Sequence, residues 1–288
     1  MTTNATPRFD AAIGRYVYLT IDGVEYRTYF ESNGTGIPLL LQHTAGADGR
    51  QWRHVLEDAE LARHFQLIAY DLPYHGKSVP PTGERWWAQE YRLTRDFLVQ
   101  VPVTLARALG LARPLYMGSS IGGHLALDLA RERPDDFRAV IGLEAAAYTP
   151  GGYVDDFHHP NIGNDYKAHL MYGLMSPTSP EAFRRETLWV YSQGAPSVFK
   201  GDLYYYSVDH DLREGAEEID TNRLSVDILN GEYDWSGTPA MGEAVASRIP
   251  GARYQTMPGL GHFPMSEDPV RFLDLIRPVL LRAAGITP

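Results

Sequence analysis

The strongest chemical signal in the sequence is a serine that lies between small residues. Residues 118–122 read Gly-Ser-Ser-Ile-Gly, a Gly-x-Ser-x-Gly pattern with Ser120 at its centre. A short apolar run precedes this pattern, and a helical pattern with apolar residues four apart follows it. Small residues on both sides allow a tight strand-to-helix turn, which exposes the serine hydroxyl and brings the N–H groups of the helix start beside it. The pattern therefore predicts a nucleophilic serine beside backbone amides. These amides would stabilise the oxyanion that forms when the serine attacks a carbonyl group.

A serine hydroxyl becomes a good nucleophile only when an imidazole accepts its proton and a carboxylate orients that imidazole. Of the ten histidines, His262 is the one that lies in a loop rich in Gly and Pro, between a late strand and the last helix. Asp234 follows the strand predicted at 224–229, and it is the acid that we favour. Glu144, which ends the strand predicted at 139–144, is the alternative acid, because a carboxyl in apolar surroundings is costly unless it is paired.

These residues depend on a regular arrangement of elements. Short apolar runs and helical patterns alternate along most of the chain, which predicts a parallel sheet covered by helices on both faces. The chain starts differently, with an antiparallel hairpin predicted at 16–30 around Asp22 and Gly23, a dipeptide that suits a type I′ turn. The strands predicted after the hairpin are residues 37–42, 65–70, 115–117, 139–144, 224–229 and 253–257. The predicted helices are residues 50–63, 88–109, 121–133, 239–248 and 269–282.

The alternation stops between residues 148 and 222, where prolines and aromatic residues are frequent. We interpret this segment as a helical cap, residues 148–222, inserted into one α/β core domain formed by residues 1–147 and 223–288. Aromatic walls with polar tips suit a bulky, partly hydrophobic or aromatic substrate. The run 155–159 contains Asp and His side chains, but adjacent residues rarely converge on one ion, so we expect no metal site.

The composition limits the functions that the chain can have. It has 288 residues, 26 Lys and Arg against 36 Asp and Glu, a net charge of −10, and no cysteine. The lack of cysteine excludes thiolate nucleophiles and disulfides, and the negative charge disfavours nucleic acid and anionic membranes as partners. No run reaches about 18 apolar residues, and the first residues do not resemble a secretory signal. We therefore expect a cytoplasmic protein with a small-molecule substrate, and the sequence leaves a homodimer open.

Taken together, the motifs resemble those of the capped serine hydrolases of the α/β-hydrolase family. Residues 39–46 resemble the family's His-Gly-x oxyanion loop, residues 71–78 its Asp-x-Pro-Gly-His-Gly-x-Ser turn, and residues 134–140 the approach to its sixth strand. Residues 261–269 resemble its catalytic-histidine loop. The resemblance implies an α/β-hydrolase fold, with a mostly parallel eight-stranded sheet, helices on both faces and an inserted helical cap. It also implies catalysis without a cofactor.

The resemblance further implies where the oxyanion is held. The donors would be the backbone N–H groups of Ile121 and Ala45, with Thr44 as their neighbour. Thr44 and Tyr74 both stand where the family usually has Gly, so the backbone turn at each position must accommodate a side chain. The residues that we expect to contact the substrate are His43, Glu144, Trp87, Trp235, Phe263 and Tyr148.

The expected reaction is hydrolysis of a carboxylic ester or lactone through an acyl-enzyme on Ser120. Hydrolysis of a carbon–carbon bond in a ring-cleavage diketone remains an alternative, because that branch of the family uses the same triad. A lyase or a non-catalytic ligand receptor on the same fold also remains open, since the fold alone does not determine the function.

Overall fold

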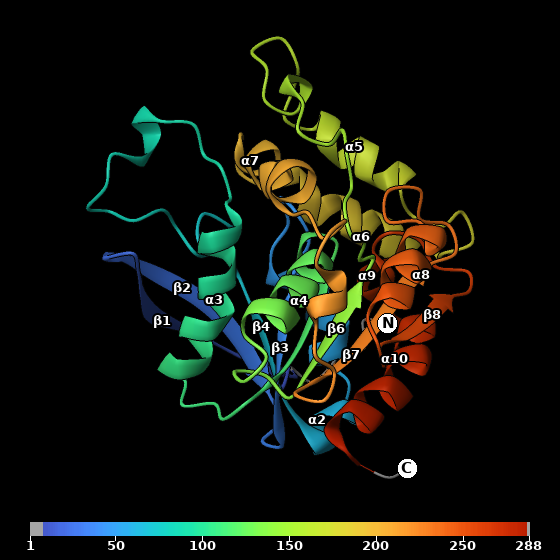
Figure 1. Ribbon diagram of the computed structural model, residues 1–288. Helices are drawn as coiled ribbons and strands as arrows, with labels where there is room; N and C mark the ends of the chain where they lie inside the picture. Colours follow the sequence, from blue (N-terminus) through green and yellow to red (C-terminus); the bar gives the residue numbers. More distant parts are fainter. Residues whose placement is uncertain (1–7, 287–288) are drawn as a thin grey trace, which may run out of the picture.

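The computed structural model describes residues 8–286, and its centre is an eight-stranded sheet (Figure 1). The strand order is β1-β2-β4-β3-β5-β6-β7-β8, and only the β1–β2 and β2–β4 pairs are antiparallel. This confirms the predicted mostly parallel sheet. The strands are β1 Ile13–Ile21, β2 Val24–Asn33, β3 Ile37–Gln42, β4 Phe65–Tyr70, β5 Leu115–Ser119, β6 Ala139–Leu143, β7 Ser225–Gly231 and β8 Arg253–Met257.

The two ends of the sheet follow different sequence rules. β1 and β2 form the predicted hairpin, in which Asp22 and Gly23 have φ angles of 50° and 80°. Positive φ at both central residues is what a type I′ turn requires. The central strands have continuous apolar runs instead, because both of their faces are covered.

Alternate residues of the central strands enter two separate hydrophobic cores. Leu40 of β3 and Tyr116 of β5 belong to one core, whereas Leu39 and Met117 belong to the other. Helices α3 Arg95–Ala108, α4 Ile121–Glu132 and α8 Pro239–Arg248 cover the first face. The second face is covered by α1 Arg53–Leu56, α2 Leu61–His64, α9 Pro264–Glu267 and α10 Pro269–Ala284.

Two predicted helices differ from the structure. The helix predicted at 50–63 is broken into a 3-10 turn, α1 and α2, and the Asp58 side chain in the break accepts a hydrogen bond of 2.8 Å from the Leu61 N–H. The helix predicted at 88–109 begins only at Arg95, where the Thr94 hydroxyl accepts from the Phe97 N–H. A capping side chain thus marks the start of α3.

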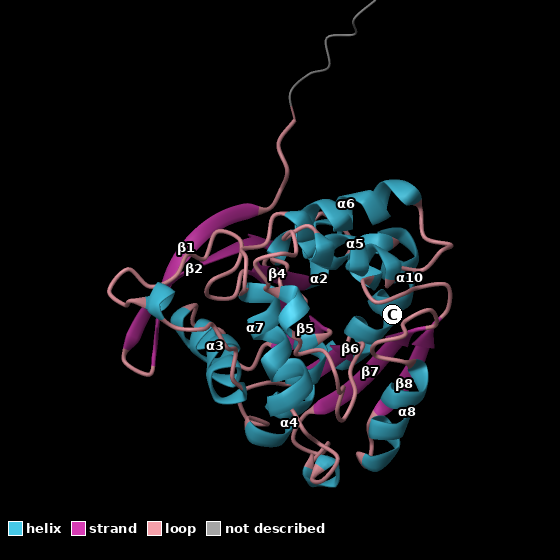
Figure 2. Cartoon of the chain, turned by 90° about the horizontal axis from the view of Figure 1, so that it is seen from above, coloured by secondary structure: helices cyan, strands magenta, loops and turns pink. Residues whose placement is uncertain are grey.

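The segment that we predict to be the cap contains three helices: α5 Tyr166–Gly173, α6 Glu181–Ser192 and α7 Val198–Tyr204. Figure 1 shows them above the sheet, and Figure 2 shows the same helices from above. A single π-helical turn, η4 Tyr205–Asp209, follows α7 directly. Within residues 8–286, no helix has the length and apolar character that a membrane span requires.

Candidate active site

Ser120 lies on a strained turn between β5 and α4. Its φ and ψ angles are 59° and −112°, a combination that costs a residue with a side chain on the order of 1–3 kcal/mol. Its N–H donates to the Leu143 carbonyl oxygen at 3.0 Å, which ties the turn to β6. A Cβ at Gly118 would lie 2.6 Å from the Gly122 backbone, so only glycine fits there. The turn therefore has the geometry that the Gly-x-Ser-x-Gly pattern predicts.

His262 and Asp234 are in direct contact. The Nδ1 atom of His262 lies 2.7 Å from Oδ2 of Asp234, and both residues are buried. Asp234 also accepts hydrogen bonds from the N–H groups of Ser236 at 2.7 Å and Gly237 at 3.0 Å. Burial alone would raise the pKa of Asp234, but His262 and these hydrogen bonds outweigh it and hold the pKa below its usual value. Asp234 is thus an ionised carboxylate that orients the imidazole.

Glu144 lies beside this pair with the opposite tendency. It is fully buried, its φ is 55°, and both of its carboxyl oxygens are within 3.1 Å of the Gly231 N–H. Burial raises the pKa of Glu144 well above its usual value, and the charge on Asp234 adds to the effect. Glu144 therefore holds its proton more strongly than an ordinary carboxyl group, and it does not contact His262 through any hydrogen bond of the described chain.

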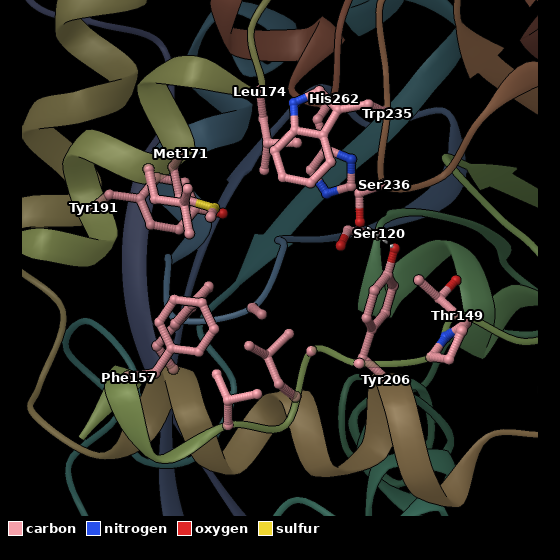
Figure 3. Close-up of a pocket in the computed structure, with 18 of the residues that line it drawn as sticks. Ser120, Thr149, Phe157, Met171, Leu174, Tyr191, Tyr206, Trp235, Ser236 and His262 are labelled. Atoms are coloured by element: carbon pink, nitrogen blue, oxygen red, sulfur yellow. Dashed lines mark hydrogen bonds between the residues drawn. The ribbon is translucent and has the colours of Figure 1, made fainter. Parts of the chain in front are cut away.

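Ser120 and His262 face the same cavity, which has a volume of about 420 Å³ (Figure 3). Within the described residues, no hydrogen bond joins the Ser120 hydroxyl to His262. In hydrolases without substrate such contacts are commonly long and shorten when the substrate binds. Much of the cavity wall comes from the cap, including Phe157, Met171, Leu174, Tyr191 and Phe199.

The backbone at residues 44–46, which we call the oxyanion loop, leaves one amide available. The Thr44 N–H donates to Gln51 at 3.0 Å, and the Gly46 N–H donates to Asp202 at 2.7 Å. The Ala45 N–H makes no hydrogen bond within residues 8–286, and Ala45 lines the cavity. Ile121 is the first residue of α4, where the N–H has no partner inside the helix. Both predicted donors therefore have backbone amides without a hydrogen-bond partner within residues 8–286.

Thr44 has a structural role in this arrangement. Its hydroxyl contacts both Gln51 and the Tyr191 hydroxyl of α6, and it does not line the cavity. Tyr74, at the other position where the family usually has Gly, adopts a φ of 74°, the left-handed conformation that favours glycine. Its ring packs against Tyr91 with centroids 4.8 Å apart, which compensates for the strain.

Of the six expected substrate contacts, Trp235 lines the cavity. The structure corrects the expectation for His43 and Glu144, which lie beneath the surface of the site. His43 uses its two ring nitrogens on the Thr44 carbonyl oxygen at 2.8 Å and the Leu72 N–H at 3.1 Å. It supports the oxyanion loop from below, just as Glu144 supports Asp234.

The other three expected contacts also lie outside the cavity lining, and their positions have clear causes. Phe263 is fully buried behind His262, with its ring 4.9 Å from the imidazole. Tyr148 packs against the guanidinium of Arg213 at 4.1 Å. Trp87 is 63% exposed on the segment before α3.

Two buried carboxyl groups of the site have no motif that singles them out in the sequence. Glu267 accepts from the N–H groups of Gly261 at 2.5 Å and Phe263 at 3.3 Å, which flank His262, and from the cap residue Ser176 at 3.1 Å. Asp202 of α7 accepts from the oxyanion loop and lies 2.8 Å from Nε2 of His75. Glu267 lies within residues 261–269 but between Ser266 and Asp268, and Asp202 lies between Gly201 and Leu203, so the neighbouring residues do not mark either carboxyl group as buried.

Comparisons with known proteins agree with this geometry. A family model described as "alpha/beta hydrolase fold" matches residues 37–269. A 2-hydroxy-6-oxo-6-(2'-aminophenyl)hexa-2,4-dienoic acid hydrolase of Metapseudomonas resinovorans is 23% identical over 284 residues, which cover 94% of this chain and 92% of that protein.

Solved structures show the same fold at low sequence identity. A thermophilic esterase of Thermogutta terrifontis superposes with a TM-score of 0.78 at 22% identity, covering 93% of this chain and 99% of that one. The enol-lactonase of Burkholderia xenovorans gives 0.77 at 20% identity, with 93% and 100% covered. Because the family model spans most of the sequence, the chain belongs to the alpha/beta hydrolase fold family.

Proposed function

We propose that the protein is a serine hydrolase that cleaves a carboxylic ester or lactone of a bulky, partly hydrophobic or aromatic small molecule. The observation that carries this proposal is the shared cavity. It contains a serine held at φ 59°, a histidine 2.7 Å from a buried carboxylate, and a free backbone amide at Ala45. These are the four parts that acyl transfer requires.

The reaction follows from the positions of these groups. The Ser120 oxygen attacks the substrate carbonyl carbon while Nε2 of His262 accepts the serine proton, and Asp234 stabilises the resulting imidazolium through Nδ1. The amides of Ala45 and Ile121 hold the oxyanion, each contributing about 2.7–4 kcal/mol in the transition state. His262 then donates its proton to the leaving oxygen. In the second half of the reaction, His262 accepts a proton from a water molecule that attacks the acyl group, and it returns this proton to the Ser120 oxygen as the acid is released.

The cavity wall favours a neutral substrate. Among the described residues that line it there is no Lys, Arg, Asp or Glu, and most side chains are apolar or aromatic. A carboxylate buried there would lose its hydration without gaining an ion-pair partner, which costs several kcal/mol. This supports an ester or lactone over a ring-cleavage dienoate, which carries a carboxylate.

Carbon–carbon bond hydrolysis is the second candidate. It is favoured by the similarity to the Metapseudomonas dienoic acid hydrolase along 94% of this chain. The proposed triad serves both reactions, so the substrate must decide between them.

A two-step experiment tests the proposal. A fluorophosphonate probe should label the wild type and the Ser119→Ala variant but not Ser120→Ala, because Ser119 precedes the turn and its buried hydroxyl faces away from solvent. Turnover is then compared between a panel of aryl esters and lactones and a panel of 2-hydroxy-6-oxo dienoates. Labelling with ester or lactone turnover is the expected result. Turnover of dienoates alone would replace the ester proposal with the second candidate, and absent labelling would contradict both.

A further inference from the structure

Three hydroxyl groups gather on one side of the cavity. Figure 3 shows Thr149, Tyr206 and Ser236 on the same side as Ser120, with Phe157, Met171 and Tyr191 across the cavity. The proposed catalytic steps use none of these three hydroxyls. The three hydroxyls form a separate polar patch in a wall that is otherwise mostly apolar. The hydrogen bonds that they can still donate or accept therefore indicate which polar group of the substrate binds beside them.

The hydrogen bonds of His124 determine whether the Thr149 hydroxyl can donate or accept a hydrogen bond in the cavity. Nδ1 of His124 lies 3.1 Å from the Ser120 carbonyl oxygen, which can only accept, so Nδ1 carries the proton. Burial lowers the pKa of His124 well below its usual value, so the ring is neutral and Nε2 is an acceptor. Thr149 Oγ1, 3.1 Å from that Nε2, must therefore donate its hydrogen to His124. The Thr149 oxygen is left with lone pairs for the cavity and no hydrogen to give.

Tyr206 and Ser236 together supply a hydrogen-bond donor to the cavity. Their hydroxyl oxygens are 3.1 Å apart, so one of the two hydrogens is used between them and the other stays available. Burial raises the pKa of Tyr206, so its hydroxyl keeps its proton. The π-helical turn η4 fixes the direction of this side chain: Tyr205 bonds to Asp128 at 2.6 Å, while the next residue, Tyr206, faces the cavity. Such turns are frequent at functional sites.

We infer that this patch is a binding subsite for a neutral hydroxyl group of the substrate, located near the scissile carbonyl. A substrate hydroxyl donates to Thr149 and accepts from the Tyr206–Ser236 pair, which satisfies both parts of the subsite. A carbonyl or ether oxygen only accepts, and an ammonium group only donates, so each would leave one part unpaired. The substrate class is therefore a hydroxylated ester or lactone with an apolar remainder. This inference rests on the proposed function.

The test uses ester pairs in which a hydroxyl replaces a methyl group. 2-Hydroxyethyl and propyl benzoate vary the alcohol part, and the 4-nitrophenyl esters of mandelic and 2-phenylpropanoic acid vary the acyl part. Each kcat/KM is divided by the rate constant for hydroxide-catalysed hydrolysis of the same ester. In at least one pair the hydroxylated ester should be preferred by about 3- to 10-fold, the usual worth of a net neutral hydrogen bond.

Substitutions in the polar patch test whether the preference for hydroxylated esters arises there. Thr149→Val should remove it, and so should the double variant Tyr206→Phe/Ser236→Ala, because either hydroxyl of that pair alone would keep a hydrogen to donate. Thr149→Ser, which keeps the hydroxyl, should retain it. Tyr205→Phe is the matched control, because it loses a buried hydroxyl of the same turn on the side that faces away from the cavity. If Thr149→Val does not fold, the double variant tests the donor half by itself, since Ser236 is only partly buried and Tyr206→Phe keeps the ring.

The possible failures can be told apart. Equal turnover within both pairs, or a preference that survives in Thr149→Val and in Tyr206→Phe/Ser236→Ala, overturns the subsite while Ser120 labelling still supports a serine hydrolase. If no ester reacts and Ser120 is not labelled, the proposed function and the subsite fail together.

Discussion

Two carboxyl groups lie buried near His262, and their pKa values are shifted in opposite directions. Asp234 contacts the imidazole at 2.7 Å and its pKa is lowered, whereas the pKa of Glu144 is raised by burial. A sequence with two candidate acids at the ends of adjacent strands does not reveal which one is ionised. Only the distances and the surrounding N–H groups distinguish them.

Exchanging each carboxyl for its amide should separate their roles. Asp234→Asn removes the charge that stabilises the imidazolium and leaves His262 in the wrong tautomer, so kcat should fall by about 10⁴-fold. Glu144→Gln keeps an acceptor for the Gly231 N–H and should change kcat by less than about 10-fold. Steady-state kinetics on one ester measure both. An active Asp234→Asn enzyme together with an inactive Glu144→Gln enzyme would assign the acid to Glu144.

Glu144 should also make stability depend on pH. Its folded-state pKa is raised, so the folded protein holds a proton that the unfolded chain releases above about pH 4.3. The stabilising contribution of that proton is complete below this pH and is lost as the pH rises toward the folded-state pKa. Glu144→Gln has no such loss, so its free energy of unfolding relative to wild type should increase between pH 5 and pH 8. Urea unfolding at both pH values measures this. A difference that stays constant with pH would mean that Glu144 is ionised in the folded protein.

At the scale of elements, the cap helices hold the oxyanion loop. Asp202 of α7 is fully buried, and it binds the Gly46 N–H at 2.7 Å and lies 2.8 Å from His75. Burial alone would lower the pKa of His75, but Asp202 outweighs it and the pKa is raised, which indicates an ion pair. Tyr191 of α6 contacts the loop through the Thr44 hydroxyl. The position of the Ala45 amide therefore depends on the cap as well as on β3.

Removing this support should reduce turnover more than substrate affinity. Asp202→Ala frees Gly46 and leaves His75 unpaired, so the Ala45 amide shifts and kcat should fall by roughly 10- to 10²-fold while KM changes little. Asp202→Asn still offers an acceptor to Gly46 and should recover most of that loss. The control is Asp155→Ala, which removes an exposed cap carboxyl paired with Lys200. Rates of fluorophosphonate labelling give a second readout. A pure KM effect would contradict a role for Asp202 in positioning the loop.

The same contacts show which parts of the structure can be predicted from the sequence. The strands and the turn at Ser120 follow from local patterns of apolar residues and glycines, and His262 and Asp234 lie in loops next to predicted strands. Asp202 bonds to a residue 156 positions away, and Tyr206 to one 30 positions away. Contacts of this kind depend on how the cap packs on the core. Trp87 and Phe263 do not line the cavity, and the sequence could not show this, because an aromatic residue near a site has the same local pattern whether it lines a cavity, packs behind it or lies on the surface.

At the scale of the whole molecule, two separate effects should lower the turnover of anionic substrates: the net negative charge of the chain and the absence of a counter-charge in the described cavity lining. The chain has a net charge of −10, and the described residues that line the cavity include no Lys or Arg. The first effect acts at long range and is screened by salt, whereas the second is a desolvation cost inside the cavity that salt does not remove.

Comparing a neutral ester with a similar anionic one separates these two contributions. At low salt, 4-nitrophenyl pentanoate should have a kcat/KM at least about 10-fold above that of the 4-nitrophenyl monoester of succinic acid, since a buried carboxylate without a partner costs more than 1.4 kcal/mol. Raising the ionic strength from about 0.02 M to 0.5 M should narrow the gap but not close it, because the Debye length shrinks while the cavity stays uncharged. Equal turnover at low salt would show that a cationic group reaches the substrate. It would restore the anionic dienoates as candidates, because a counter-charge in the site would offset both the desolvation cost and the long-range repulsion.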